Sequence, residues 1–230
     1  MTGSIPSKLG QFRGISALYL QRNRLSGSIP TEFGLLRNGY DGIQLDLSHN
    51  QLNGTIPDLQ QLTDLAALDL SHNSLSGTLP VTLGALNPYG LLVLRLDSNA
   101  LTGSIPSELG LLKSMKELDL SAQSLMGAIP HELLELAENF QLRYLNISGN
   151  VELQGSIPEA LCALNPNVSD YGDFGKQAEI CLYWFSESAV NPPQSYTCAI
   201  DFDCTSQLCG CLCPCGARTG GDRRPSVFSP

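Results

Sequence analysis

Pairs of leucines two residues apart recur along this chain, and each pair is followed by a polar stretch, an Asn and a further leucine. Leucines at this spacing lie on one face of a β-strand. Each segment therefore predicts one short strand, whose intervening residue we expect to point into solvent. The pattern Leu-x-Leu-x-x-Asn-x-Leu, with small departures, occupies residues 18–25, 45–52, 68–75, 94–101, 118–125 and 145–153.

A second pattern, Gly-Ser/Thr/Ala-Ile/Leu-Pro, follows each of these segments and also stands at the start of the chain. The Gly permits a backbone angle that other residues resist, and the Pro fixes φ at the start of a short helix. A regular spacing of 23 to 28 residues predicts a solenoid of stacked units with parallel strands and one continuous core. Short helices are expected at PSKLGQF (6–12), PTEFGLL (30–36), PVTLGAL (80–86), PSELGLL (106–112) and PHELLELAENF (130–140).

The Asn of each unit is expected to donate its side-chain amide to backbone carbonyls of a neighbouring turn. Such a ladder satisfies backbone groups that a coiled solenoid leaves buried. Gln123 stands at one of these positions, and its extra methylene is expected to weaken that rung without breaking the fold.

The combined motif LxxLxLxxNxLxGxIPxxLgxL resembles the plant-type leucine-rich repeat. The repeat sequences are also similar to those of leucine-rich-repeat proteins of algae and diatoms. The resemblance covers roughly residues 1–160. It implies an α/β solenoid, a right-handed superhelix or horseshoe with a parallel concave sheet and short convex helices. It also implies that a protein, peptide or glycan binds on the concave side.

Three parts are expected along the chain: a solenoid over 1–160 whose first repeat is incomplete, a cysteine-rich C-terminal cap over 161–216, and a disordered tail over 217–230. Met1 falls inside a repeat, with no cap or signal peptide before it. Because a solenoid needs a polar cap at each end, we expect this sequence to be a fragment of a longer protein, whose remainder could include a membrane anchor.

Composition narrows the classes of partner. The chain carries 13 Lys and Arg against 22 Asp and Glu, a formal net charge of −9. Phosphate contacts need clustered basic residues, so we expect no nucleic-acid partner. A basic group, Arg218, Arg223 and Arg224, lies in the expected tail. No apolar run is long enough to span a membrane.

The cysteines gather near the C-terminal end, where two interpretations compete. Disulfides would make a cap, whereas closely spaced thiolates could hold Zn²⁺ or Cu⁺. We favour disulfides, in which each of the last four cysteines pairs with one of the first four, although the pairing itself stays open. The cysteines are Cys162, Cys181, Cys198, Cys204, Cys209, Cys211, Cys213 and Cys215.

Three N-x-[ST] sequons stand at Asn53, Asn146 and Asn167. Together with the cysteines they favour the secretory route and an extracellular or cell-surface location. A glycan at Asn146 would crowd one end of the concave face.

Signatures of catalysis are lacking in the sequence: there is no GxSxG, P-loop or kinase motif. HELLE at His131 lacks the second His of a zinc protease motif and is better explained as a helix start.

His49 and His72 occupy one repeat position and are expected to lie about 5 Å apart. A pH-sensitive or metal-binding pair is one interpretation, and ordinary exposed repeat residues the favoured one. We expect no catalytic residue, metal or cofactor.

The concave positions are the candidate ligand contacts. Aromatic residues and Arg are frequent in binding hot spots, and a strip that mixes Arg and acids suits a ligand of mixed charge rather than a polyanion. The candidates are Tyr19, Arg22, Gln44, Asp46, His49, Asp69, His72, Arg95, Asp97, Glu117, Asp119 and Tyr144.

These features predict a non-catalytic recognition module of a receptor-like or secreted protein in signalling or defence. Two alternatives remain at this stage. One is an extracellular matrix protein that works by self-association. The other is a metal-binding protein that uses its cysteine thiolates.

Overall fold

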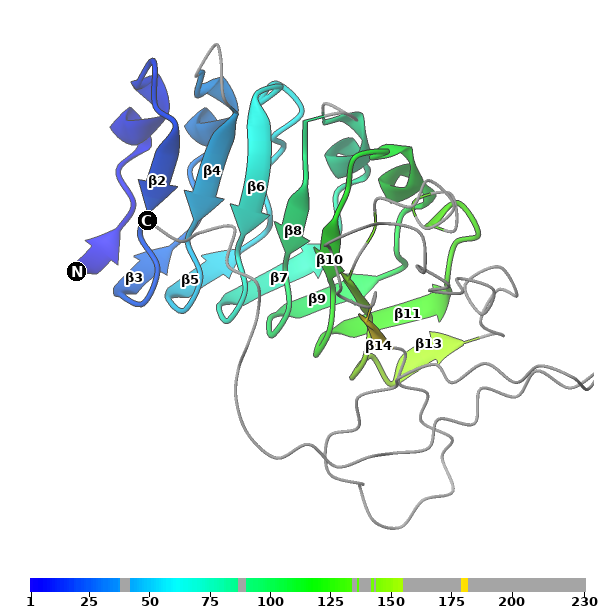
Figure 1. Cartoon of the computed structure of the whole chain (residues 1–230). Coiled ribbons are helices and arrows are strands. Elements are labelled where there is room, and N and C mark those ends of the chain that lie inside the picture. The colour runs from blue at the N-terminus through cyan, green and yellow to red at the C-terminus, as the bar shows by residue number, and fades with distance from the viewer. Residues whose placement is uncertain are drawn as a thin grey trace, which may run out of the picture.

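The computed structural model describes residues 1–37, 42–86, 90–133, 136, 142 and 144–154, together with the backbone of one strand at 179–181. These residues form a solenoid of stacked repeats (Figure 1). Each complete repeat contributes one strand to each of two parallel seven-stranded sheets. The predicted solenoid is therefore confirmed.

The first sheet, which we call the concave sheet, contains the predicted Leu-x-Leu strands. Its register keeps the leucines in line, with Leu18 beside Leu45 and Leu45 beside Leu68. Side chains of equivalent residues therefore form straight columns across the repeats. In spatial order its strands are β14 (Glu179–Cys181), β12 (Tyr144–Asn146), β10 (Glu117–Asp119), β8 (Val93–Arg95), β6 (Leu65–Asp69), β4 (Ile43–Asp46) and β2 (Ala17–Tyr19).

The second sheet was not predicted from the sequence. It forms where each repeat continues from its Asn through Leu-x-Gly. In β7 the leucine is buried and its neighbours are exposed, which is the alternation of a strand with one buried face. Its strands, in spatial order, are β1 (Thr2–Ser4), β3 (Arg24–Gly27), β5 (Gln51–Gly54), β7 (Ser74–Thr78), β9 (Ala100–Gly103), β11 (Ser124–Ala128) and β13 (Glu152–Gln154).

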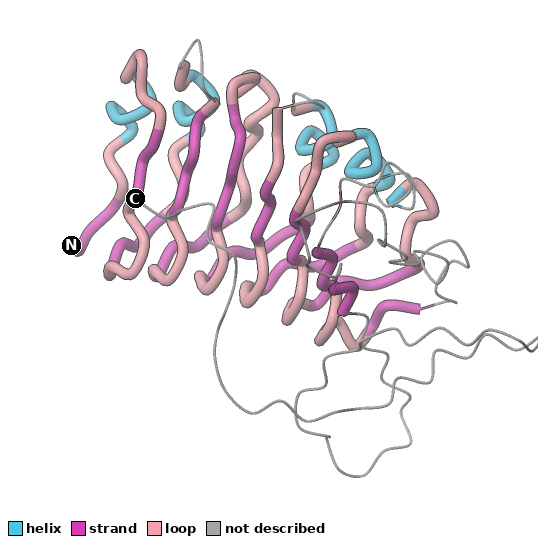
Figure 2. Tube along the Cα trace, viewed as in Figure 1, coloured by secondary structure: helices cyan, strands magenta, loops and turns pink. Residues whose placement is uncertain are grey.

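Short 3₁₀ helices occupy four of the expected helix positions (Figure 2). Each follows a Pro with φ between −62° and −67°, which confirms the predicted helix start. One apolar core runs from Ile5 to Ile147. The fifth expected helix, at 130–140, lies mostly outside the described residues. The helices are η1 (Ser7–Gln11), η2 (Thr31–Leu35), η3 (Val81–Ala85) and η4 (Ser107–Leu111).

The Asn ladder is also confirmed. The Nδ2 of Asn99 donates to the carbonyl of Leu70 in the preceding repeat at 3.0 Å and to Leu96 in its own turn at 2.9 Å. Its Oδ1 accepts from the backbone N–H of Leu75 at 2.9 Å. Asn50, Asn73 and Asn150 make the same set of contacts.

Gln123 forms a reduced rung of the ladder. It contacts the preceding repeat through the carbonyl of Leu96 and the N–H of Leu101. Among the described residues, it makes no bond to the carbonyls of its own turn, because its longer side chain carries the amide past them. This matches the expectation that the rung is weakened while the fold persists.

A glycine in the helices sets how closely the repeats stack. A Cβ placed on Gly84 of η3 would lie 2.2 Å from the backbone oxygen of Glu108 in η4. Only a residue without a side chain allows this approach. Gly34 of η2 has more room, since its nearest contact would be the oxygen of Asp58 at 3.3 Å. The stack is looser there because residues 57–62 contain no helix, with a turn only at Gln60 and Gln61.

Several expectations fall outside the described residues. The disulfides, the sequon at Asn167 and the tail cannot be placed, and of the cysteines only the backbone of Cys181 is described, in β14. Within the described part, no helix is long and apolar enough to cross a membrane.

Candidate functional site

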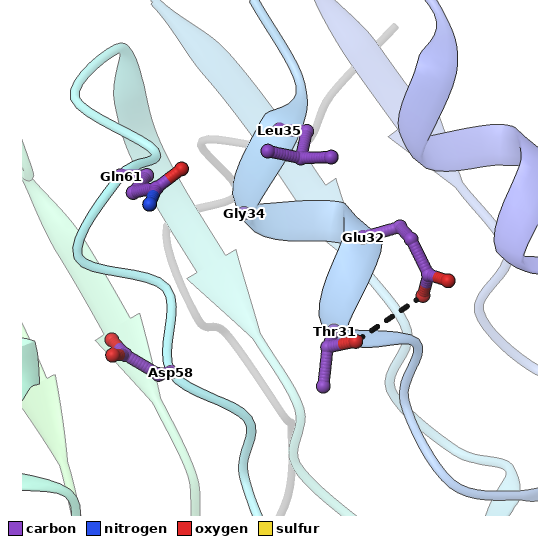
Figure 3. A pocket seen from close by; sticks show the side chains of 6 residues that line it. All are labelled: Thr31, Glu32, Gly34, Leu35, Asp58 and Gln61. Carbon is purple, nitrogen blue, oxygen red and sulfur yellow. Dashed lines mark hydrogen bonds between the residues drawn. The ribbon is translucent and has the colours of Figure 1, made fainter.

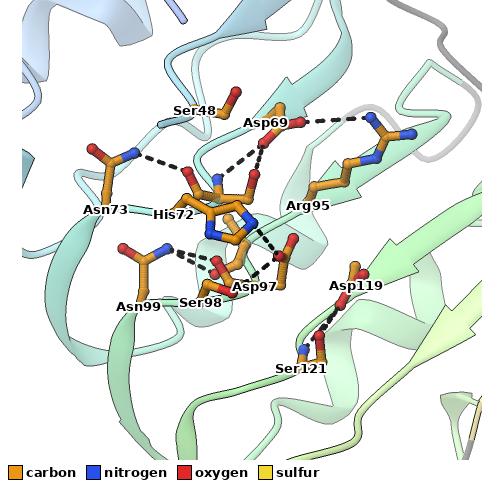
Figure 4. A network of polar contacts seen from close by, with 12 residues as sticks. Ser48, Asp69, His72, Asn73, Arg95, Asp97, Ser98, Asn99, Asp119 and Ser121 are labelled. Carbon is orange, nitrogen blue, oxygen red and sulfur yellow. Dashed lines mark hydrogen bonds and ion pairs between the residues drawn. The ribbon is translucent and has the colours of Figure 1, made fainter. Parts of the chain in front are cut away.

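A buried ion-pair cluster occupies the middle of the concave sheet. The Nε and Nη2 of Arg95 on β8 donate to the two carboxylate oxygens of Glu117 on β10, at 2.5 and 2.8 Å. On the other side, Asp69 of β6 lies 3.6 Å from Nη1 of Arg95 (Figure 4). Desolvation of Arg95 by itself lowers its pKa, but the adjoining carboxylates of Glu117 and Asp69 outweigh it, and the net pKa is raised. The guanidinium is thus held charged between two acids.

The aspartates of the Leu-Asp-Leu segments have a structural role that the sequence analysis did not foresee. The Oδ1 of Asp46 accepts hydrogen bonds from the backbone N–H and the hydroxyl of Ser48, at 3.0 and 2.7 Å. Asp69 with Ser71 and Asp119 with Ser121 repeat this arrangement. Each aspartate therefore fixes the turn that leaves its strand.

The prediction that these residues point into solvent is wrong for the centre of the sheet. Neighbouring strands about 4.8 Å apart crowd side chains on the same face. The resulting burial raises the pKa of Asp46, and the adjacent charge of Asp69 raises it further, against the lowering effect of the Ser48 hydrogen bonds. The buried members of the predicted contact set are Asp46, Asp69, Arg95, Asp97, Glu117 and Asp119.

His49 and His72 stack at the edge of the concave sheet. Their ring centroids lie 4.2 Å apart with an interplanar angle of 11°, close to the predicted spacing. Nε2 of His72 lies 3.6 Å from a carboxylate oxygen of Asp97 (Figure 4). In the described residues, no group of three potential ligands that could hold a metal ion is present.

Both histidines have positive φ, at 53°, a backbone conformation that the sequence analysis missed. The same position is left-handed in every complete described repeat, so it forms a column along the edge of the sheet. Non-glycine residues adopt this region infrequently. The column consists of Arg22, His49, His72, Ser98, Ala122 and Gly149.

Most of the predicted contacts that reach solvent gather at the N-terminal end of the concave sheet, whereas Tyr144 lies at the other end. Tyr19 is 40% exposed and donates its hydroxyl to Oε1 of half-buried Gln44 at 2.7 Å. Arg22 and His49 are exposed beside them, and His72 is partly exposed. The structure therefore brings together five of the predicted residues as an accessible strip, which we call the N-terminal strip: Tyr19, Arg22, Gln44, His49 and His72.

Tyr144 lies at the other end of the sheet and is half-buried. Its hydroxyl donates to Oδ2 of Asp119 at 3.0 Å and lies 3.1 Å from Nδ2 of Asn146. Tyr144 is therefore tied into the polar network of the sheet and is separate from the N-terminal strip.

Two further features lie away from the concave sheet. A shallow cavity of about 250 Å³ opens where the helix stack is interrupted after η2, between Leu35 and Gln61 (Figure 3). His131 has an 81% exposed side chain, whose Nδ1 lies 3.4 Å from a carboxylate oxygen of Glu132.

Comparison with known proteins agrees with this architecture. The family model described as Leucine Rich Repeat matches residues 15–36, 43–62, 64–86, 90–112 and 141–164. No curated protein sequence matches the chain.

Several solved structures do match the chain. The crystal structure of a TDR receptor is 36% identical with a TM-score of 0.65, over 71% of this chain and 27% of that one. The HAESA receptor kinase ectodomain from Arabidopsis, in complex with an extended IDA peptide hormone, is 40% identical with a TM-score of 0.60, over 70% of this chain and 26% of that one. A chain of the BIR3–SERK2 complex from Arabidopsis thaliana is 38% identical with a TM-score of 0.50, over 60% of this chain and 69% of that one.

This chain spans about a quarter of the first two structures and about two thirds of the third. The shared repeat motif, the two parallel sheets and these matches establish that the chain belongs to the plant-type leucine-rich-repeat proteins.

Proposed function

We propose that the chain is a non-catalytic recognition module of an extracellular, receptor-like signalling protein, and that it binds an extended peptide along the concave sheet. Solved structures of a similar ectodomain support the ligand class, since the HAESA receptor kinase is described in complex with the IDA peptide hormone, both in an extended form and together with the co-receptor SERK1.

The observation that carries the proposal is the separation of the concave residues into a buried centre and an exposed N-terminal strip. The buried ion pairs at Arg95 hold neighbouring strands together and make the concave sheet rigid beneath the proposed peptide. The N-terminal strip combines Tyr19 and Arg22 with Gln44 and two histidines, and Tyr and Arg are among the residue types that dominate binding hot spots. A rigid scaffold also reduces the entropy cost of binding.

The charge distribution favours a ligand with opposite charges at its two ends. Residues 1–37 contain five basic residues and one acidic residue, Glu32. The centre reverses this balance, because Arg95 is the one cation among five buried acids of the predicted contact set. An acidic group of the ligand would be attracted to Arg22, and a basic group to the acidic centre.

The distance across the strands of the concave sheet determines how long a test peptide must be. From β2 to β12 the six strands span roughly 24 Å, which about eight residues of extended peptide cover. An array of such peptides, each carrying Asp or Glu at one end and Lys or Arg at the other, tests the proposal directly. Both chain directions should be included, with all-acidic, all-basic and neutral peptides as controls.

We expect the charge-polarised peptides to bind in one direction and the all-acidic peptides to bind less. Equal binding by all charge classes, or binding that survives Tyr19→Ala combined with Arg22→Ala, would show that the N-terminal strip is not the recognition surface. Far-UV circular dichroism of the double variant controls for loss of fold.

A further inference from the structure

Two of the three sequons lie in described strands, and their surroundings differ. Asn53 stands on β5 of the second sheet, whereas Asn146 stands on β12 of the concave sheet. An N-linked glycan is bulky and needs an exposed amide nitrogen with open space around it. The two sites can therefore be compared atom by atom.

Asn53 has the surroundings that a glycan needs. Its side chain is exposed on the face of β5 opposite to buried Leu52, and within the described residues it makes no hydrogen bond. Thr55, the hydroxyl residue of the sequon, is exposed as well.

The neighbours of Asn53 also leave space. On β3, Ser26 is in register with Gln51 and Gly27 with Leu52, so this strand offers small residues as it reaches the level of Asn53. Ser74, which is in register with Asn53 on β7, is exposed and equally small. The residues level with Asn53 on the neighbouring strands are therefore small, and the longer exposed side chains of Arg24 and Gln51 lie earlier along β3 and β5.

Asn146 has a structural role instead. Its Oδ1 accepts from the backbone N–H and the hydroxyl of Ser148, at 3.1 and 2.7 Å. Asp119 and Ser121 show the same geometry one repeat earlier. The sequon Asn-Ile-Ser is therefore the Asp-x-Ser turn of the other repeats with Asn in place of Asp.

The atom of Asn146 that would carry a sugar is already in use. Its Nδ2 lies 3.1 Å from the hydroxyl of Tyr144 and 3.5 Å from Oδ2 of Asp119, within the polar network of the concave sheet. A glycan there would displace these contacts and spread over the strands on either side.

We propose that Asn53 carries an N-linked glycan and that Asn146 does not. The glycan at Asn53 covers the second sheet around β5 and leaves the N-terminal strip on the concave sheet open. It also excludes this part of the second sheet as a protein-docking surface. The inference rests on the secretory location contained in the proposed function.

Site mapping of the full chain tests the inference. The chain is secreted from a eukaryotic host behind a cleavable leader, treated with peptide N-glycosidase and digested. The enzyme converts each glycan-bearing Asn to Asp, which a mass spectrum detects. Cleavage after Glu152 and Glu159 separates the peptide of Asn146 from that of Asn167, whose use is scored independently.

We expect conversion at Asn53 in nearly all molecules and none at Asn146. Asn53→Gln and Thr55→Ala should each abolish the glycan at this site. Asn146→Asp is the matched control, because it removes the sequon but restores the Asp-x-Ser turn, and it should leave the glycan mass unchanged. An unmodified Asn53, or a glycan on Asn146 in folded protein, would overturn the proposal. Ligand binding plays no part in this measurement, so its outcome is separate from that of the peptide array.

Discussion

Arg95 and Glu117, on adjacent strands of the concave sheet, form a two-pronged ion pair that is almost completely buried. Both residues were predicted ligand contacts, yet each is only 5–6% exposed and each satisfies the other. A buried pair of this kind fixes geometry, whereas its net contribution to stability is small. The pair therefore belongs to the scaffold beneath the N-terminal strip.

Replacing one partner of this pair should be far more damaging than replacing both. Glu117→Ala removes the acid that accepts two hydrogen bonds from buried Arg95 and should lower the free energy of unfolding by about 3 kcal/mol. The double replacement Arg95→Met with Glu117→Leu removes both charges of the pair, and Asp69, which loses Arg95, keeps its hydrogen bonds from Ser71, so the loss should be only about 1 kcal/mol. Urea unfolding followed by circular dichroism measures both. Additive losses from the two single replacements would contradict a coupled pair.

The close stacking of the helices predicts a contrast between two glycines. Gly84→Ala should destabilise the protein by roughly 1–3 kcal/mol, because its Cβ would overlap the backbone of Glu108, which cannot move without shifting a whole repeat. Gly34→Ala is the matched control. It occupies the same position of its helix but faces the looser stack, and should cost less than about 1 kcal/mol. Similar losses for both would mean that helix contacts do not set the repeat spacing.

The weakened rung at Gln123 predicts a stabilising substitution. Gln123→Asn should allow the amide to reach the carbonyls of its own turn, as Asn99 does, and raise the free energy of unfolding by about 1 kcal/mol. The reciprocal change Asn99→Gln should lower it by a similar amount, about 1 kcal/mol. Thermal melts of the two variants provide the comparison, and a lower melting temperature for Gln123→Asn would refute this explanation.

Asp46 predicts a pH dependence of stability. Burial raises its pKa above the ordinary 3.8, so between 3.8 and the raised value the folded chain binds more protons than the unfolded chain. The contribution of Asp46 to stability is therefore greatest in acid and falls as the pH rises through this window. Asp46→Asn removes the effect and keeps an acceptor for Ser48, as Asn146 does for Ser148.

The stability of Asp46→Asn relative to the wild type should therefore be more favourable at pH 7 than at about pH 3.5. Asp46→Ala is the control: it removes the acceptor as well as the titrating group, so it should be about 1 kcal/mol less stable than Asp46→Asn at both pH values, while its stability relative to the wild type changes with pH in the same direction. A relative stability of Asp46→Asn that does not change with pH would argue against a raised pKa.

The repeat motif predicts much of this fold because each of its residues has a local physical task. The leucine pairs specify strands, the Pro starts the helix, and Asn50 or Asn99 joins neighbouring turns. Gln123 was recognisable as a weak rung for the same reason. The second sheet was missed because its strands are short and all but β13 contain a Gly, although the alternation around Leu75 was a usable signal.

The candidate site was harder to predict. Sequence places Tyr19 and Asp119 on the same face of one sheet, but burial depends on how closely the strands and their neighbours crowd that face. Exposure separates Tyr19, at 40%, from Asp119, at 0%. The stacking of His49 on His72 followed from repeat position alone, whereas their positive φ did not, because neither residue type requires it.

We predict that an acidic group of an extended peptide binds at Arg22 of the N-terminal strip. The most direct test is a charge-swap experiment by isothermal titration calorimetry, with the best charge-polarised peptide of the array and its variant in which Lys replaces the acidic residue. Arg22→Glu should weaken binding of the original peptide at least tenfold, about 1.4 kcal/mol, and the Lys peptide should recover affinity for Arg22→Glu but not for the wild type. Equal affinity of the wild type and Arg22→Glu for the original peptide would contradict the account.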